Sequence, residues 1–202
     1  MYTQSRFLRR IIKSAANKFI KDETFKVQKK GEGDFVTDTD KKIEEFLIKK
    51  IRRKFPRFDI ISEEFNPKDE LSRDCFVIDP IDGTNNFIAG LPLWGIQIAM
   101  VIDYKTVSCV IYLPKFREMY WADENGAYRN GKKIKRKTSS NLFAEEGHRE
   151  PHTEKEYRRT ACAALNYTWA AMGYLRSFRL HKKTLWDNLP GQFLVEKSEE
   201  TK

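Results

Sequence analysis

The stretch CFVIDPIDGTNNF, residues 75–87, begins as an apolar run and then places two carboxylates around a proline. An uninterrupted apolar run such as Cys75–Ile78 is typical of a strand buried in a sheet. Pro80 has no N–H to donate to a sheet ladder, so the pattern predicts that the strand ends just before it. Asp79 and Asp82 are then expected to leave the core together at the strand end.

Two carboxylates at one strand end repel each other unless a proton or a cation lies between them. Mg²⁺ is a natural neutraliser, because it prefers oxygen ligands and keeps positions for water or a substrate phosphate. Gly83 and Thr84 follow directly and predict the start of a short helix, where free backbone N–H groups bind phosphate oxygens. The alternative is an ordinary loop, since Asp-Pro and Asp-Gly are also common turn sequences.

Further acidic segments favour the metal site over the loop. They are DFVTDTD at residues 34–40, Glu63 and Glu64 after a short apolar strand at residues 58–62, and Asp187 after Trp186. With the signature Asp-Pro-Ile-Asp-Gly-Thr-x-Asn-Phe, matched at residues 79–87, they resemble the inositol monophosphatase family of Mg²⁺-dependent, lithium-sensitive phosphatases. The resemblance runs from the N-terminus to about residue 137 and resumes over about residues 158–196.

The resemblance implies an α+β fold, a layered α/β sandwich of the sugar-phosphatase type whose mostly antiparallel N-terminal sheet is flanked by helices. It implies an N-terminal α+β half that carries the metal loop (residues 1–138), a polar loop (139–157) and a C-terminal α/β half (158–202). Family members usually carry more chain in the middle and at the C-terminus. The C-terminal half is therefore expected to be abbreviated, with unpaired sheet edges.

The resemblance also implies roles for matching residues of this sequence. The implied catalytic residues are Glu63 and Thr84, which position water, and Asp34, which orients the Thr84 hydroxyl. The implied ligands of two or three Mg²⁺ ions are Glu63, Asp79, the backbone carbonyl of Ile81, Asp82 and Asp187. The implied substrate contacts are Asp82, Gly83, Thr84, Ala163 and Asp187.

Helix capping is a competing role for the acids of residues 34–40. Thr37 and Asp40 have the spacing of a capping box at the start of a helix expected over residues 39–55. We therefore interpret Asp38 and Asp40 as capping residues, which leaves Asp34 for the site.

Periodicity predicts the remaining elements. Apolar residues recur at helical spacing over residues 5–21. Runs of β-branched and aromatic residues predict an antiparallel meander over 94–102, 106–113 and 118–122, and then a basic strand over 132–137. A helix is expected over 160–173, a strand over 175–180 and a final helix from about 185, whereas the polar residues 139–157 lack periodicity and predict a surface loop or disorder.

Composition bounds the class of protein. The 202 residues are 40% hydrophobic and 33% charged, which is enough for one sizeable core. No apolar stretch is long enough to span a bilayer, and the N-terminus is typical of an amphipathic helix rather than a signal peptide. The three cysteines lie far apart in apolar segments, so we expect reduced thiols, a cytoplasmic location and no membrane partner.

The formal net charge of +9 suits anionic substrates and also nucleic acids. The cations gather at residues 129–137 and 176–183 without the interleaved aromatic residues of single-strand binders. A solvated basic face is therefore the favoured interpretation, and a nucleic-acid partner is the less favoured one.

The leading functional hypothesis is Mg²⁺-dependent hydrolysis of a small phosphate monoester, an inositol monophosphate or a related sugar or polyol phosphate, by water and without a covalent intermediate. One alternative is a catalytically impaired member that binds RNA or a transcription complex; another is a phosphatase for 3′-phosphonucleotides or sugar bisphosphates. Leu180 stands where inositol-specific members place a ring-binding glutamate, which weighs against inositol itself. Relatives often dimerise, so a homodimer is one expected state.

Overall fold

The computed structural model describes residues 2–20, 24–137, 140–146, 157–181 and 184–199. Its centre is a seven-stranded sheet in the order β3-β4-β5-β6-β7-β8-β9, in which β3 and β4 are parallel and the other neighbours antiparallel. The strands are β3 Asp59–Ser62, β4 Cys75–Asp82, β5 Gly95–Ile102, β6 Lys105–Leu113, β7 Glu118–Asp123, β8 Gly126–Arg129 and β9 Lys132–Lys133. The predicted α+β fold with its mostly antiparallel sheet is confirmed.

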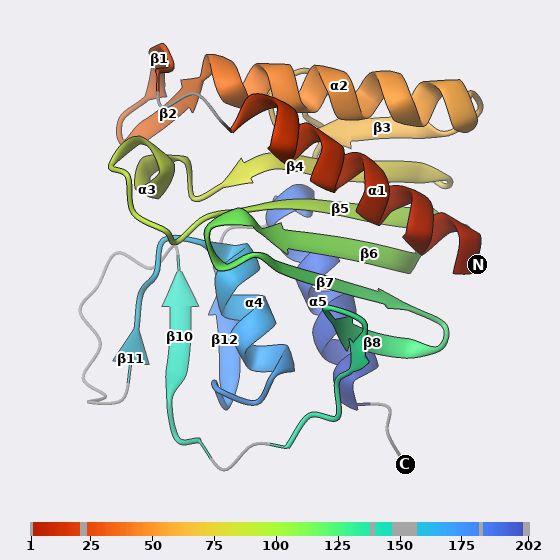
Figure 1. Ribbon diagram of the computed structural model, residues 1–202, viewed down its shortest axis with the longest axis vertical. Helices are drawn as coiled ribbons and strands as arrows, with labels where there is room; N and C mark the ends of the chain where they lie inside the picture. Colours follow the sequence, from red (N-terminus) through yellow and green to blue (C-terminus); the bar gives the residue numbers. More distant parts are fainter. Residues whose placement is uncertain (1, 21–23, 138–139, 147–156, 182–183, 200–202) are drawn as a thin grey trace.

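Helices cover both faces of this sheet (Figure 1). The helices α1, Tyr2–Phe19, and α2, Asp38–Lys54, lie on one face, while α4, Ala163–Ala171, and α5, Leu185–Glu199, lie on the other. The short helices α3, Thr84–Ile88, and η1, Pro114–Phe116, connect strands. Of the helices in the described ranges, none combines the length and apolarity that crossing a membrane requires.

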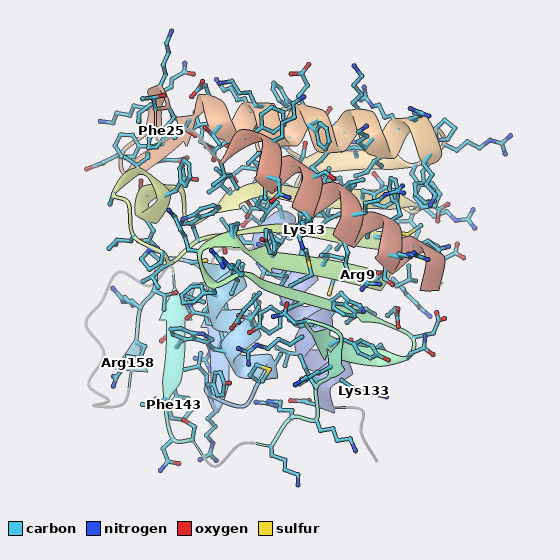
Figure 2. The ribbon with its side chains drawn as sticks, viewed as in Figure 1. Arg9, Lys13, Phe25, Lys133, Phe143 and Arg158 are labelled. Atoms are coloured by element: carbon cyan, nitrogen blue, oxygen red, sulfur yellow. The ribbon has the colours of Figure 1, made fainter. Side chains whose placement is uncertain are left out.

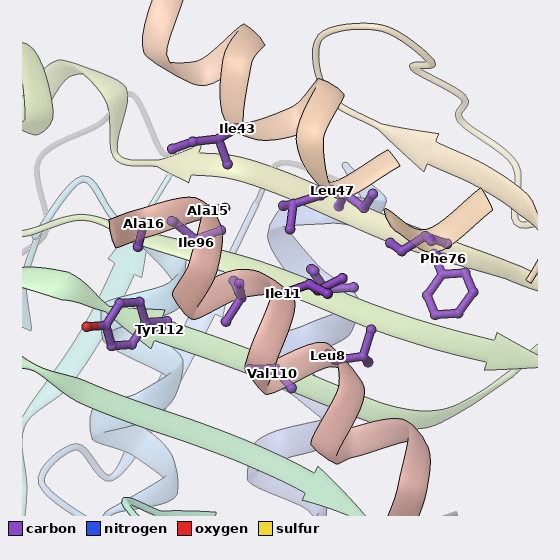
Figure 3. Close-up of a cluster of buried hydrophobic side chains, with 14 of the residues drawn as sticks. Leu8, Ile11, Ala15, Ala16, Ile43, Leu47, Phe76, Ile96, Val110 and Tyr112 are labelled. Carbon is purple, nitrogen blue, oxygen red and sulfur yellow. The ribbon is translucent and has the colours of Figure 1, made fainter. Parts of the chain in front are cut away.

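Alternation along the strands fills a core on each side of the sheet. In β4, Phe76 and Ile78 face α1 and α2, whereas Val77 faces α4 and α5, because successive side chains of a strand point to opposite faces. Figure 3 shows the first core, in which Leu8 of α1 and Leu47 of α2 pack on the sheet. The strand β4 is thus buried on both faces, and its end lies deep in the molecule.

The course of β4 corrects one expectation. The strand runs through Pro80 to Asp82, and Asp79 and Asp82 stay buried, 0% and 8% exposed, instead of leaving the core. The pairing with β5 shifts register between Asp79 and Asp82. A bulge interrupts the ladder there, so Pro80 can lie inside the strand without leaving a missing ladder bond.

Two smaller sheets lie beside the central one. The antiparallel hairpin of β1, Val27–Gly31, and β2, Asp34–Thr37, leads into α2, and a parallel sheet has the order β11-β10-β12. Its strands are β10 Phe143–Glu146, β11 Tyr157–Arg158 and β12 Ser177–Leu180.

The strand β10 corrects the expectation of a loop over residues 139–157. Ala144 is buried in a small core with Ala170 and Leu175, and β10 pairs on both sides with segments that follow it in the chain. Four residues show too little alternation to predict a strand from sequence. Residues 147–156 of the expected loop lie outside the described part of the chain.

Candidate metal centre

Four carboxylates converge at the end of β4. Asp79 and Asp82 belong to the β4 bulge, Asp187 lies in the first turn of α5, and Glu63 follows β3 directly. One carboxylate oxygen from each of Asp79, Asp82 and Asp187 lies within 4.8 Å of the other two. All four side chains line one cavity of about 230 Å³.

Burial makes full ionisation of this cluster unfavourable. Burial, followed by the charges of Glu63, Asp82 and Asp187, raises the pKa of Asp79 well above its usual range. Burial, with the Asp187 charge, raises the pKa of Asp82 to about 7. Burial also raises the pKa of Glu63 to about 8, although the nearby Lys30 charge opposes it.

One buried oxygen of the cluster is unpaired. Asp79 Oδ2 accepts from Gln97 Nε2 at 3.3 Å, but Oδ1 has no hydrogen-bond partner among the described residues. A buried polar atom is normally paired, and a set of carboxylate oxygens is the donor set that hard divalent cations prefer. The residues therefore fit a divalent cation such as Mg²⁺.

The N-terminus of α4 holds Asp82 in place. The backbone N–H of Ala164 donates to Asp82 Oδ2, and the Cys162 thiol lies 3.2 Å from the same oxygen. Cys162 is the N-cap of α4, and its Sγ accepts from Leu165 N at 3.4 Å. A helix N-terminus favours a carboxylate, so α4 lowers the cost of the Asp82 charge. Ala163, a predicted substrate contact, lines the cavity beside it.

Thr84 makes a different contact from the one expected. Its Oγ1 donates to the Ile81 carbonyl at 2.9 Å and lies 3.3 Å from Asp40 Oδ1. The expected partner, Asp34, lines the cavity, but its side chain is 58% exposed and lies 3.8 Å from Lys30 Nζ.

Asp40 has two roles, whereas its capping-box spacing predicted only one. It completes the predicted capping box with Thr37 and also faces Thr84 from the first turn of α2. Burial raises the pKa of Asp40 to about 6. A capping residue whose carboxylate has a second free oxygen can reach another chain segment, and sequence spacing gives no sign of this.

Sequence reasoning also missed Glu44, which holds the segment that carries Glu63. The buried Glu44 carboxylate accepts from Ser62 Oγ at 2.5 Å, Glu64 N at 2.9 Å and Phe65 N at 2.8 Å. The available signal was the position of Glu44 on the apolar stripe of the predicted helix. A carboxylate that is buried there needs hydrogen-bond partners, because burying an unpaired charge costs free energy.

Lys30 of β1 was missed as well. Its Nζ lies 3.1 Å from Glu63 Oε1 and 2.7 Å from Glu64 Oε1. Burial alone would lower the pKa of Lys30, but the charge of Glu63 raises it, and the net change is a rise. A lysine in a polar hairpin carries no sequence signal for this contact.

The turn between β4 and α3 requires glycine. Gly83 has φ of +86°, and a Cβ there would lie 2.9 Å from the Leu93 carbonyl oxygen and 3.2 Å from that of Ala161. Asn86 Nδ2 donates to the carbonyls of Leu93 and Thr160, both at 2.7 Å, which ties α3 to the chain before α4. Gly83 and Thr84 carry N–H groups at the start of α3 that the helix itself leaves unbonded.

Comparisons with known proteins agree with the site. The profile of the inositol monophosphatase family matches residues 3–198. The Nus factor SuhB of Escherichia coli strain K12 is 32% identical over 199 residues, 87% of this chain and 74% of SuhB. The fructose-1,6-bisphosphatase/inositol-1-monophosphatase of Aquifex aeolicus is 37% identical over 117 residues, 57% of this chain. That match spans only 44% of the Aquifex protein.

Solved structures share the fold. The SuhB protein of Bartonella henselae superposes with a TM-score of 0.83 at 25% identity, covering 96% of this chain and 84% of that one. The Thermotoga maritima IMPase superposes with a TM-score of 0.79 at 26% identity, covering 97% of this chain and 82% of that one. With the family profile matched over nearly all of its length, this chain belongs to the inositol monophosphatase family.

Proposed function

We propose that the protein hydrolyses a small phosphate monoester, an inositol monophosphate or a related sugar or polyol phosphate, in a Mg²⁺-dependent reaction. The observation that carries the proposal is the convergence of Asp79, Asp82 and Asp187 in a cavity that Gly83 and Thr84 also line. Two or three Mg²⁺ ions would be held by Glu63, Asp79, the Ile81 carbonyl, Asp82 and Asp187. When bound, Mg²⁺ supplies an activated water and neutralises charge on the phosphate.

The protein's own groups bind the substrate and orient the attacking water. Gly83 and Thr84 bind the phosphate through their backbone N–H groups, and Asp82, Ala163 and Asp187 contact the substrate. Glu63 and Thr84 position the attacking water, and Asp40 supports the Thr84 hydroxyl. Asp34 lines the same cavity and stays a candidate catalytic residue.

Attack by water is direct in this proposal, because the Cys162 thiol of the cavity is a poor nucleophile. Cys162 is 1% exposed, and burial raises its pKa well above the usual range, so the thiol stays protonated. Lithium is expected to inhibit, as the family resemblance implies.

The substrate side of the cavity leaves two further candidates open. The side chain of Leu180 lines the cavity and cannot bind an inositol ring hydroxyl through a hydrogen bond. A sugar bisphosphate and a 3′-phosphonucleotide therefore stay alternative substrates. The 32% identity to a Nus factor favours, as a second function, a regulatory role in RNA or transcription complexes with weak or no catalysis.

A phosphate-release assay tests the proposal. The purified protein is mixed with inositol monophosphates, sugar phosphates, sugar bisphosphates and 3′-phosphonucleotides, with Mg²⁺ or with a chelator. We expect release only with Mg²⁺, inhibition by lithium, and at least a hundredfold loss in Asp82→Asn. Release that ignores both Mg²⁺ and this substitution would contradict the proposal, and no release with any substrate would favour the regulatory role.

A further inference from the structure

The outer face of the α1 and α2 layer is strongly cationic. The helix α1 contains five arginines and lysines and no carboxylate, against a net charge of +9 for the whole chain. The C-terminal half of α2 adds five more cations. We call the exposed members of this set the α1/α2 basic face: Arg6, Arg10, Lys13, Lys18, Lys49, Lys50, Arg52, Arg53 and Lys54. Figure 2 labels Lys13 on α1 within it.

Aromatic rings in the seam between the helices bring like charges together. Lys18 of α1 and Lys50 of α2 both approach the ring of Phe46, at 5.7 and 5.2 Å. Arg10 of α1 and Lys54 of α2 both approach the ring of Phe7, at 5.9 and 4.3 Å. The rings hold one cation from each helix at each place, so the two helices form one positive surface.

The cations of this face are not neutralised by close ion pairs with described carboxylates, although the exposed Glu45 lies one helical turn before Lys49 on α2. None of its nine cations forms an ion pair with a described carboxylate. The basic segment at residues 129–137 is partly neutralised, because Arg129 pairs with Glu118 and Arg136 pairs with Glu199, whereas its four lysines form no ion pair with a described carboxylate. Unpaired like charges repel one another and favour a polyanion as the partner.

The positions of the apolar residues in this layer limit the kinds of polyanion that the face can bind. The exposed large hydrophobic residues of the described chain are Val27, Phe65, Leu91, Tyr104, Phe116 and Tyr174, all outside α1 and α2. Among the residues of α1 and α2 whose burial is described, none is a large exposed hydrophobic residue that could insert into a lipid layer. Phe7 is buried, and Phe46 is partly buried against the core, so their rings are not platforms for unstacked bases.

We propose that the α1/α2 basic face binds the phosphate backbone of a double-stranded nucleic acid without sequence specificity. Arg6 and Lys18 are separated by about 18 Å along α1, at about 1.5 Å per residue. A duplex carries one charge per about 1.7 Å of axis, so the face can meet several phosphates at once. This binding is independent of the proposed hydrolysis, because the face lies outside the carboxylate cavity.

Fluorescence anisotropy with a labelled 20-base-pair RNA duplex and the matching DNA duplex tests the inference, with binding measured from about 50 to 200 mM salt. The variant Arg10→Gln, Lys13→Gln, Lys50→Gln, Lys54→Gln is expected to bind at least about tenfold more weakly and to lose about three to four from the slope of log K against log salt. The control Lys132→Gln, Lys133→Gln, Lys135→Gln, Lys137→Gln removes the same charge elsewhere and is expected to change the slope by less than one.

Other results would overturn the inference. Equal losses in the two variants would show that net charge alone attracts the duplex. Tighter binding to a single strand, or binding to phosphatidylserine vesicles but not to either duplex, would assign the face to another partner. Circular dichroism checks folding, and the pair Lys13→Gln and Lys50→Gln gives about half the slope change if the fourfold variant is unstable. The DNA and RNA arms show which duplex binds more tightly.

Discussion

Asp79 combines full burial with an unpartnered carboxylate oxygen, a combination that costs stability unless the site gains a ligand. Its neighbours Asp82 and Glu63 also have raised pKa values. The metal-free fold therefore retains protons that the unfolded chain would release. The features that fit the cluster for a cation are the same features that destabilise it without one.

Removing the Asp79 charge is expected to stabilise the metal-free protein. Asp79→Asn keeps the side-chain size and removes the charge, so the melting temperature at pH 8 in a chelator should rise by about 2–5 °C. Differential scanning calorimetry measures it, with the exposed Asp69→Asn as the control. A fall in melting temperature would mean that Asp79 stabilises the metal-free fold.

The metal-free protein is also expected to lose stability as the pH rises. A carboxyl group whose folded pKa is raised holds its proton while the unfolded chain releases it near pH 4. The contribution of these two groups to stability is thus fully present below about pH 4 and is lost as the pH rises to about 7 for Asp82 and about 8 for Glu63. Mg²⁺ competes with these protons, so it should raise the melting temperature more at pH 8 than at pH 5. Thermal melts at both pH values, with and without Mg²⁺, check the sign; a larger Mg²⁺ effect at pH 5 would refute it.

Asp40 and Asp34 can be distinguished by substitution. Asp40→Asn disturbs the contact with Thr84 and is expected to lower kcat at least about tenfold, whereas the exposed Asp34→Asn should change it less than about threefold. Asp40→Asn also weakens a helix cap by about 1 kcal/mol, so kcat is measured well below the melting temperature. A larger loss in Asp34→Asn would restore the role implied by the family resemblance.

The helices α4 and α5 position two of the site's acids from one interface. Asp82 is held at the start of α4, and Asp187 lies in the first turn of α5. The helices cross at Gly191, where a Cβ would lie 2.1 Å from the Tyr167 ring. This close contact leaves no room for a larger residue between the two helices.

Gly191→Ala is expected to separate these helices. The added methyl group meets a ring that is packed in the interface, so the free energy of unfolding should fall by about 1–3 kcal/mol. Gly31→Ala is the matched control, because its Cβ would lie 3.9 Å from the nearest atom, Asp34 Cβ. Urea denaturation measures both; equal stability of the two variants would show that the interface can relax.

Sequence reasoning was most successful for long periodic elements. The stripe of α1 and the meander β5–β6–β7 were predicted because buried positions recur many times within each of them. Sequence reasoning failed for elements whose structure depends on tertiary contacts. The course of β4 past Pro80 depends on a bulge against β5, and β10 depends on partners far along the chain.

The same distinction applies to the residues of the candidate site. The motif acids Asp79, Asp82 and Asp187 do meet, because strand and helix ends fix them. Asp40, Glu44 and Lys30 were missed because each acts through a contact between distant segments. Spacing along one helix or hairpin does not encode such contacts.

At the scale of the whole molecule, the carboxylate cavity and the basic face occupy different places. The carboxylate cavity lies at the end of β4, where segments from both halves of the chain meet, and the basic face lies on the outside of the α1 and α2 layer. A cation that binds only the folded protein stabilises it by mass action. Metal affinity thus reports directly on whether Glu63, Asp79, Asp82 and Asp187 act as one site.

Isothermal titration calorimetry of the metal-free protein with Mg²⁺ at pH 8 measures that affinity most directly. Saturable binding is expected, with at least about a tenfold loss in Asp79→Asn and no loss in Asp69→Asn. Absence of binding, or equal binding by both variants, would contradict a metal site at the end of β4.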